Sequence, residues 1–213
     1  MNPDHFVRDN SQLLAPPLVP EIRLHLASEV IPLWRKTEEE LAEIGVPPPY
    51  WAFAWAGGQA LARYLLDHPV TVANKRVLDF GSGSGLVAVA AAKAGAIHVT
   101  AADIDPFAIA AIARNADANN VKVETIAENI IGTNDRFDLI AVGDMCYERP
   151  LAEKLMTWLK SVEADILLGD PGRAYFPKTG LVQLATYSVP TTRELEDREI
   201  RQTGVWRLER DRG

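Results

Sequence analysis

The hydrophobic positions in the first third of the chain form short, separate patterns. Apolar residues alternate with more polar ones over 22–26, which predicts a short strand with one buried face. Residues 37–40 have the spacing of a capping box and predict the start of a short helix. A dense aromatic patch at 47–58 precedes a helical pattern at 59–67. Residues 1–20 are polar and rich in proline, and we expect them to be a flexible lead-in.

From residue 75 onward, continuous apolar runs alternate with helical patterns. Such runs predict a parallel sheet that is buried on both faces, and the last two strands predict an antiparallel hairpin at one edge. The predicted fold is therefore α/β, a Rossmann-like sheet of seven strands that is mostly parallel, with helices on both faces. We expect residues 21–213 to form a single domain, with 21–70 as its N-terminal extension. Strands are expected at 76–80, 97–102, 121–126, 137–142, 164–168, 181–188 and 204–208, and helices up to 94 and at 106–118 and 151–161.

Composition and charge exclude several classes of protein. The 213 residues include 22 Lys+Arg and 29 Asp+Glu, a formal net charge of −7, so nucleic acid is not expected as a partner. Cys146 is the single cysteine and the four histidines lack a ligand spacing, so we expect no metal site. Neither an export signal nor an apolar run of about 20 residues is present, and we expect no membrane contact and a cytoplasmic location.

A glycine-rich loop follows the first strand of the alternating region and reads Gly81-Ser82-Gly83-Ser84-Gly85. Glycines allow a tight turn and a close approach of ligand to backbone, and the helix N-terminus offers free N–H donors. Asp79 lies at the end of the preceding apolar strand, where a buried carboxylate needs a partner. The cationic amino group of a methionine-like ligand would be such a partner; alternatively, Asp79 caps the loop. Leu86 stands where a dinucleotide fingerprint has its third glycine, which disfavours an NAD-binding oxidoreductase.

Two further acids follow the next strand. Asp103 lies 22 positions after Gly81, near the spacing at which an acid accepts ribose hydroxyls. Asp105 could instead cap the helix that begins at Pro106. Asp79, the glycine-rich loop and Asp103 together predict a ligand that has an amino acid at one end and a nucleoside at the other. The ligand that fits this description is S-adenosylmethionine.

The segment 77–85 resembles motif I of the class I, seven-strand methyltransferases. Six further segments are similar to the DxxY group of protein-lysine methyltransferases, in particular those that act on the β subunit of electron transfer flavoprotein. The resemblance covers residues 20–206 and implies S-adenosylmethionine as cofactor, S-adenosylhomocysteine as product and electron transfer flavoprotein subunit β as substrate. Animal members are mitochondrial, and this chain has no presequence, so it resembles a bacterial form. The six segments are 20–24, 32–34, 50–61, 128–130, Gly143-Asp144-Met145-Cys146-Tyr147 and Gly169-Asp170-Pro171-Gly172-Arg173.

Asp144 and Tyr147 are the predicted catalytic residues. Asp144 follows the fourth strand, at the edge where ligands of such sheets bind. Its carboxylate can receive a lysine ammonium, which has a pKa of about 10.4 and must lose a proton before it attacks; a helix cap is the alternative. Tyr147 can form a hydrogen bond near the acceptor or form a wall of the pocket; simple packing is the alternative. The family's DxxY motif falls on these two residues.

The resemblance also implies contacts with the cofactor outside motif I. Trp55 and Gly58 would cover it, and Asn129 would contact the adenine side unless it is only a turn residue. The segment Asp170–Arg173 could shape the acceptor side, or form a rigid turn in which Arg173 pairs with an acid. The full predicted cofactor-binding set is Trp55, Gly58, Asp79, Gly81, Ser82, Gly83, Gly85, Asp103, Ile104, Asn129 and Asp144.

Other functions stay open. The acceptor could be a lysine of another protein, for example a ribosomal one, or a small nitrogenous molecule such as nicotinamide. A module that binds the cofactor without turnover would have a degraded DxxY site, whereas Asp144 and Tyr147 are both present.

Overall fold

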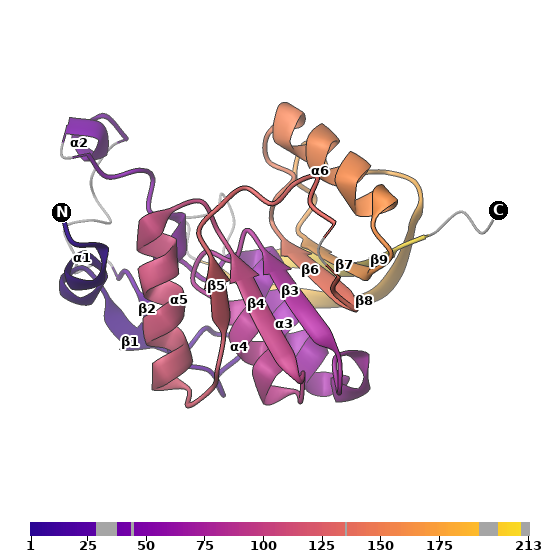
Figure 1. Ribbon diagram of the computed structural model, residues 1–213, viewed down its shortest axis with the longest axis horizontal. Helices are drawn as coiled ribbons and strands as arrows, with labels where there is room; N and C mark the ends of the chain where they lie inside the picture. Colours follow the sequence, from indigo (N-terminus) through magenta and orange to yellow (C-terminus); the bar gives the residue numbers. More distant parts are fainter. Residues whose placement is uncertain (29–37, 44, 135, 192–199, 210–213) are drawn as a thin grey trace.

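The computed structural model describes residues 1–28, 38–43, 45–134, 136–191 and 200–209. Its main sheet has the strand order β5-β4-β3-β6-β7-β9-β8 (Figure 1). Strands β3 to β7 are parallel, while β9 is antiparallel to β7 and β8, which confirms the mostly parallel sheet with a C-terminal hairpin. The strands are β3 (Arg76–Phe80), β4 (His98–Ala102), β5 (Glu124–Ile126), β6 (Leu139–Gly143), β7 (Asp165–Asp170), β8 (Leu181–Pro190) and β9 (Ile200–Leu208).

Strand β3 lies at the point where the strand order reverses. It pairs with β4 on one side and with β6 on the other. The chain continues from β3 to β4 in one direction along the sheet and from β6 to β7 in the other, so these two connections run toward opposite edges. Open α/β sheets bind ligands beyond the carboxyl ends of the strands at such a point.

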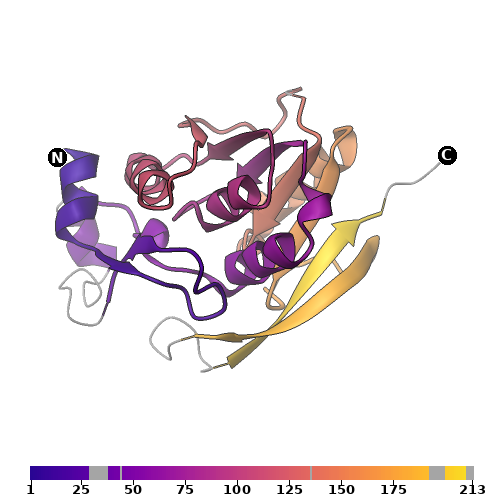
Figure 2. The ribbon, with the colours of Figure 1, turned by 90° about the horizontal axis from the view of Figure 1, so that it is seen from below.

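Helices cover both faces of the sheet, as predicted. Helices α3 (Ala56–Asp67), α4 (Leu86–Lys93) and α5 (Pro106–Ala118) lie on one side, and α6 (Arg149–Ser161) lies on the other (Figures 1 and 2). Alternate strand residues serve the two faces: Val77 packs into the cluster with α3 and α4, and Leu78 into the cluster with α6. The strands are apolar throughout because both faces are buried.

The strand–helix alternation is interrupted at two places, where the sequence predicts no helix. Among the residues described between β5 and β6 (127–134 and 136–138), and in 171–180 between β7 and β8, the chain forms turns without a helix. The predicted helix at 59–67 begins earlier, at Ala56, so Gly57 and Gly58 belong to the first turn of α3 rather than to a loop. Ala56, the last apolar residue of the aromatic patch, is buried in the same cluster as Ala60 and Leu61 of this helix.

The N-terminal residues, which are predicted to be a flexible lead-in, contain regular secondary structure. They form α1 (Pro3–Asp9) and β1 (Gln12–Leu14), and β1 pairs with the predicted strand, β2 (Leu24–Leu26). Val7 and Val19 are fully buried, and Asp4 forms an ion pair with Arg114 of α5. Both apolar residues and the charged Asp4 therefore contact the rest of the protein, which the composition of the segment does not reveal.

Shorter elements complete the structure. They are α2 (Glu38–Glu43) and two 3-10 helices, Tyr50–Ala52 and Pro69–Thr71. The motif at 32–34, the capping residue at position 37 and residues 192–199 lie outside the described residues. Within the described ranges, none of the helices has the length and hydrophobicity needed to cross a bilayer.

Candidate active site

A cavity of about 600 Å³ lies at the carboxyl ends of the parallel strands. The loops after β3, β4 and β6 line it, together with the aromatic segment that precedes α3. A cavity of this volume accommodates a small-molecule ligand. All of the predicted site residues except Gly85 line it.

The glycine-rich loop divides into a part that faces the cavity and a part that supports α4. Gly81, Gly83 and Gly85 have positive φ angles of 64°, 54° and 78°, which strain any other residue. Gly83 borders the cavity, and the nearest atom to a Cβ at this position would be 3.8 Å away. Gly85 is the N-cap of α4, and a Cβ there would approach Ile112 of α5 to 3.2 Å. Gly85 therefore serves the close packing of α4 on α5 and does not face a ligand.

Asp79 is a buried carboxylate at the inner wall of the cavity. Its Oδ2 accepts hydrogen bonds from Ser82 Oγ at 2.6 Å and from the amide of Ala88 at 3.0 Å. Burial raises the pKa of Asp79 to about 6, although both hydrogen bonds act in the opposite direction. Asp79 thus caps the loop, and a cationic ligand group would further favour its ionised form.

The two acids after β4 have separate roles. Asp103 Oδ2 accepts the amide N–H of Gly83 at 2.9 Å, so it fixes the glycine-rich loop from the neighbouring strand. Asp105 is the N-cap of α5 and accepts the amide N–H of Phe107 at 2.8 Å. Burial raises the pKa of Asp105 to about 6. This division leaves Asp103 as the acid next to the loop, and the exposed side chain of Ile104 borders the cavity beside it.

The carboxylate of Asp144 joins three separate parts of the chain. Asp144 has a positive φ of 58° directly after β6. Its Oδ2 accepts hydrogen bonds from the amides of Gly57 and Gly58 at 2.5 and 3.2 Å. Its Oδ1 accepts hydrogen bonds from Nε and a terminal nitrogen of Arg173 at 3.0 and 2.6 Å. Asp144 therefore caps a helix, as the alternative interpretation states, but the helix is α3.

Arg173 lines the cavity and was predicted only as a possible partner of an acid. Asp170, the last residue of β7, accepts the amide N–H groups of Gly172 and Arg173 at 2.7 and 2.6 Å and so forms the rigid turn. Burial raises the pKa of Asp170 to about 6. The guanidinium of Arg173 reaches Asp144 and also lies 5.7 Å from the ring centroid of Trp55. The segment Gly169–Arg173 indicates from the sequence that Arg173 pairs with an acid. It does not indicate that this acid is Asp144.

Four aromatic side chains form a wall at the mouth of the cavity. Tyr50 lies 6.0 Å from Trp55 and 5.9 Å from Tyr147, and Phe53 lies 5.8 Å from Trp55, measured between ring centroids. Tyr50 and Tyr147 are 48% and 40% exposed, and burial of the rest of Tyr147 raises the pKa of its hydroxyl. Trp51, from the same patch, belongs to the core instead. We call Tyr50, Phe53, Trp55 and Tyr147 the aromatic wall.

Asn129 and Cys146 contribute little reactive chemistry to the site. Asn129 borders the cavity, but its Oδ1 accepts the amide N–H of Ile131 at 3.1 Å, as in a turn residue. Burial raises the pKa of the Cys146 thiol to about 12, so this thiol stays protonated and is a poor nucleophile.

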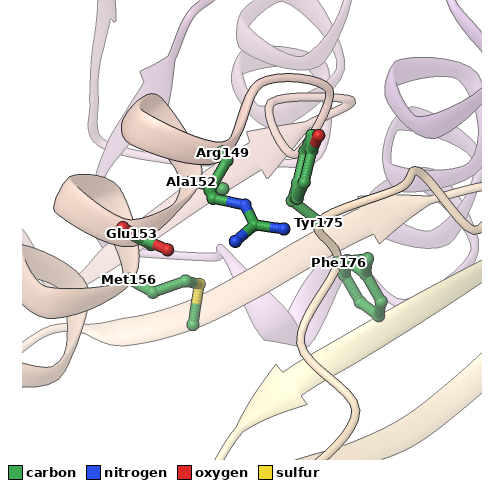
Figure 3. A pocket seen from close by; sticks show the side chains of 6 residues that line it. All are labelled: Arg149, Ala152, Glu153, Met156, Tyr175 and Phe176. Atoms are coloured by element: carbon green, nitrogen blue, oxygen red, sulfur yellow. The ribbon is translucent and has the colours of Figure 1, made fainter.

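A second cavity, of about 260 Å³, lies next to α6 and contains none of the predicted residues. Figure 3 shows the guanidinium of Arg149 beside the ring of Tyr175, at 5.4 Å from its centroid, with Met156 and Phe176 below. The amide of Tyr175 donates to the carbonyl of Cys146 at 3.1 Å. This hydrogen bond ties the segment after β7 to the loop that carries Asp144.

Known proteins are similar to this chain both in fold and, over nearly its whole length, in sequence. Residues 60–144 match the family model of ribosomal protein L11 methyltransferase (PrmA). The solved structure of magnesium protoporphyrin IX methyltransferase from Synechocystis PCC 6803 with bound SAM superimposes with a TM-score of 0.54 at 16% identity, over 72% of this chain and 80% of that one. That similarity supports the fold alone.

Curated relatives extend the match to nearly the whole chain. The electron transfer flavoprotein beta subunit lysine methyltransferase of Xenopus laevis is 41% identical, over 97% of this chain and 87% of its own length. The enzyme of the same name from Homo sapiens is 36% identical, over 94% of this chain and 80% of its own length. At this identity and coverage, the chain belongs to the family of electron transfer flavoprotein beta subunit lysine methyltransferases.

Proposed function

We propose that this protein is an S-adenosylmethionine-dependent protein-lysine N-methyltransferase whose substrate is the β subunit of electron transfer flavoprotein. The observation that carries the proposal is the arrangement of the large cavity. The glycine-rich loop, Asp79 and Asp103 form one end, and Asp144, Arg173 and the aromatic wall form the other. The names of the relatives support the choice of substrate.

The residues of the first end fit the cofactor. Asp79 is a buried carboxylate whose ionised form a ligand ammonium would stabilise, and Asp103 can accept hydrogen bonds from ribose hydroxyls. Gly81 and Gly83 bring the backbone to the cavity surface, and Ile104 offers an apolar side chain for the adenine. When bound, S-adenosylmethionine supplies an activated methyl group.

The residues of the second end fit a lysine. The aromatic wall can contact the methylene groups of a lysine stem and attract its ammonium through the ring faces. Asp144 supplies a negative charge beside the wall, which orients the acceptor nitrogen after a proton has left it. The wall is open to solvent through Tyr50 and Tyr147, so the side chain can remain attached to a folded protein.

The match to ribosomal protein L11 methyltransferases favours a ribosomal protein as the alternative acceptor. It ends at Asp144 and therefore covers β3, β4 and the glycine-rich loop, but neither Tyr147 nor Arg173. It thus reports mainly on the cofactor end. We retain the flavoprotein subunit as the substrate, and a cytoplasmic location stays a prediction from the sequence.

The test is methyl transfer from labelled S-adenosylmethionine to purified proteins. The expected product is labelled lysine in the flavoprotein β subunit, identified by peptide mass spectrometry. Ribosomal protein L11 serves as the matched second acceptor, and the Asp79→Asn variant shows the labelling that remains when cofactor binding is weakened. Labelling of L11 alone, or of a small molecule in cell extract alone, would contradict the proposed substrate.

A further inference from the structure

The acceptor positions of the Asp144 carboxylate are filled from within the chain. A carboxylate offers about four lone-pair positions. The amides of Gly57 and Gly58 occupy Oδ2, and two nitrogens of Arg173 occupy Oδ1. The side chain of Asp144 is 10% exposed. An incoming lysine ammonium can therefore bind Asp144 only if one of these partners leaves.

The amides of α3 are fixed, because their helix packs directly on the sheet. A Cβ at Gly57 would collide with the carbonyl oxygen of Gly169 in β7, so the two backbones are already in contact. These donors cannot withdraw without moving the whole helix.

Arg173, in contrast, lies on a loop and not on a helix packed against the sheet. Its side chain is 19% exposed, extends from the loop after β7 and borders the cavity. The ring of Trp55, 5.7 Å from the guanidinium, offers an alternative site for a cation. Exchange of one cation for another also spares the largely buried carboxylate the free-energy cost of being unpaired.

We propose that Arg173 occupies the subsite of the acceptor ammonium in the substrate-free protein and that the incoming lysine displaces it from Asp144. This inference rests on the proposed lysine-methyltransferase function. It makes Arg173 a specificity-determining residue, since a neutral hydroxyl or amide acceptor could not replace the charge of the guanidinium. It also means that the protein itself contains a competitor of its substrate.

The test compares Arg173→Ala with Arg149→Ala, which removes an arginine that lies on an aromatic ring, Tyr175, as Arg173 lies on Trp55, but does not border the large cavity. Methylation of the flavoprotein β subunit is measured with and without guanidinium chloride at low millimolar concentration, with potassium chloride at equal ionic strength as the control. Calorimetric binding of the same subunit in the presence of S-adenosylhomocysteine gives a readout without turnover.

We expect Arg173→Ala to lower KM and the dissociation constant about tenfold, which corresponds to about 1.4 kcal/mol. Guanidinium should inhibit this variant competitively against the protein substrate and should leave Arg149→Ala unaffected. An unchanged or raised KM, or restoration of a lost rate by guanidinium, would show that Arg173 is a fixed support and would overturn the proposal. Arg173→Gln provides the same comparison if the alanine variant does not fold. A wild-type protein that methylates no lysine would instead refute the function on which the proposal rests.

Discussion

The two ends of the large cavity, which we propose bind the cofactor and the acceptor lysine, both present carboxylates, but the chain builds them differently. At the cofactor end, Asp79 and Asp103 bind backbone or side-chain groups at most 20 positions away, in the glycine-rich loop and the start of α4. At the acceptor end, Asp144 binds Gly57, 87 positions away, and Arg173, 29 positions away.

One end is therefore formed mainly by a single loop, whereas the other is formed by segments that are far apart in the sequence. The cofactor end depends on β3, β4 and a single connection, so it forms once these strands pair. The acceptor end requires α3, the loop after β6 and the loop after β7 to meet at one carboxylate. Substitutions should therefore affect cofactor affinity alone at the first end, and activity together with stability at the second.

The largest expected effect is that of Asp144→Asn. The variant keeps an acceptor oxygen and tolerates the positive φ, but it loses the charge that pairs with Arg173. We expect methylation to fall by about 100-fold and the free energy of unfolding to fall by about 2–4 kcal/mol, because the pair is mostly buried. Single-turnover assays and urea denaturation measure the two quantities.

A matched exposed ion pair provides the control for Asp144→Asn. Lys75 and Asp165 form a pair with side chains 31% and 59% exposed, and Asp165→Asn should cost less than about 1 kcal/mol. If Asp144→Asn is as stable and as active as Asp165→Asn, the acceptor end is not held together by this carboxylate.

At the cofactor end, Asp103→Ala should weaken binding of S-adenosylhomocysteine about 10- to 100-fold without a matching loss of stability. The variant loses the predicted ribose contact and also releases the amide of Gly83. Calorimetric titration measures the affinity. Asp105→Ala is the control, since it removes a helix cap and should cost about 1 kcal/mol of stability with little change in affinity. The reverse pattern would assign the ribose to Asp105.

The affinity for S-adenosylhomocysteine should also depend on pH through Asp79. Its folded-state pKa is raised to about 6, so the carboxyl is largely protonated at pH 5 and ionised at pH 7. Because only the ionised form pairs with the ligand ammonium, affinity should rise about tenfold between these values. Titrations at several pH values test this, with Asp79→Asn as the variant that should bind weakly and without this slope. A wild-type affinity independent of pH would remove Asp79 from the amino-group site.

Two neighbouring glycines allow a sharper test of the assembled end. A Cβ at Gly57 would collide with Gly169 and with Asp144, whereas a Cβ at Gly58 would only touch Val87 at 4.0 Å. Gly57→Ala should therefore destabilise the protein by about 1–3 kcal/mol. Gly58→Ala should be neutral or stabilising by up to about 1 kcal/mol, since alanine is the better helix former. Thermal melts compare the two, and equal stabilities would contradict the close contact between α3 and β7.

The smallest effect is expected for Tyr147→Phe. The ring at the mouth of the cavity remains and only the hydroxyl is lost, so turnover should fall by about threefold to tenfold, or up to about 1.4 kcal/mol. Tyr147→Ala, which removes the ring from the aromatic wall, should be worse. If the phenylalanine variant is as inactive as Asp144→Asn, the hydroxyl has a direct chemical role.

The predictions from the sequence were most accurate where neighbouring residues determine the structure. The apolar run at Arg76–Phe80, the turn of Gly81 to Gly85 and the helix at Pro106–Ala118 have the predicted bounds. Each depends on a local cause: a strand buried on both faces, glycines at positive φ, and a proline after a capping aspartate. Asp79, Ser82 and Gly83 line one cavity for the same reason, whereas Gly85 packs against Ile112.

Only the tertiary structure decided how the acceptor end and the N-terminus are built. No local pattern indicates that Asp144 caps α3 and pairs with Arg173, or that Asp4 pairs with Arg114 over 110 positions. Hydrophobic periodicity specifies which face of an element is buried but not which element covers it. The partner of a polar group is chosen when the chain packs, because the free energy of an unpaired buried charge appears only there.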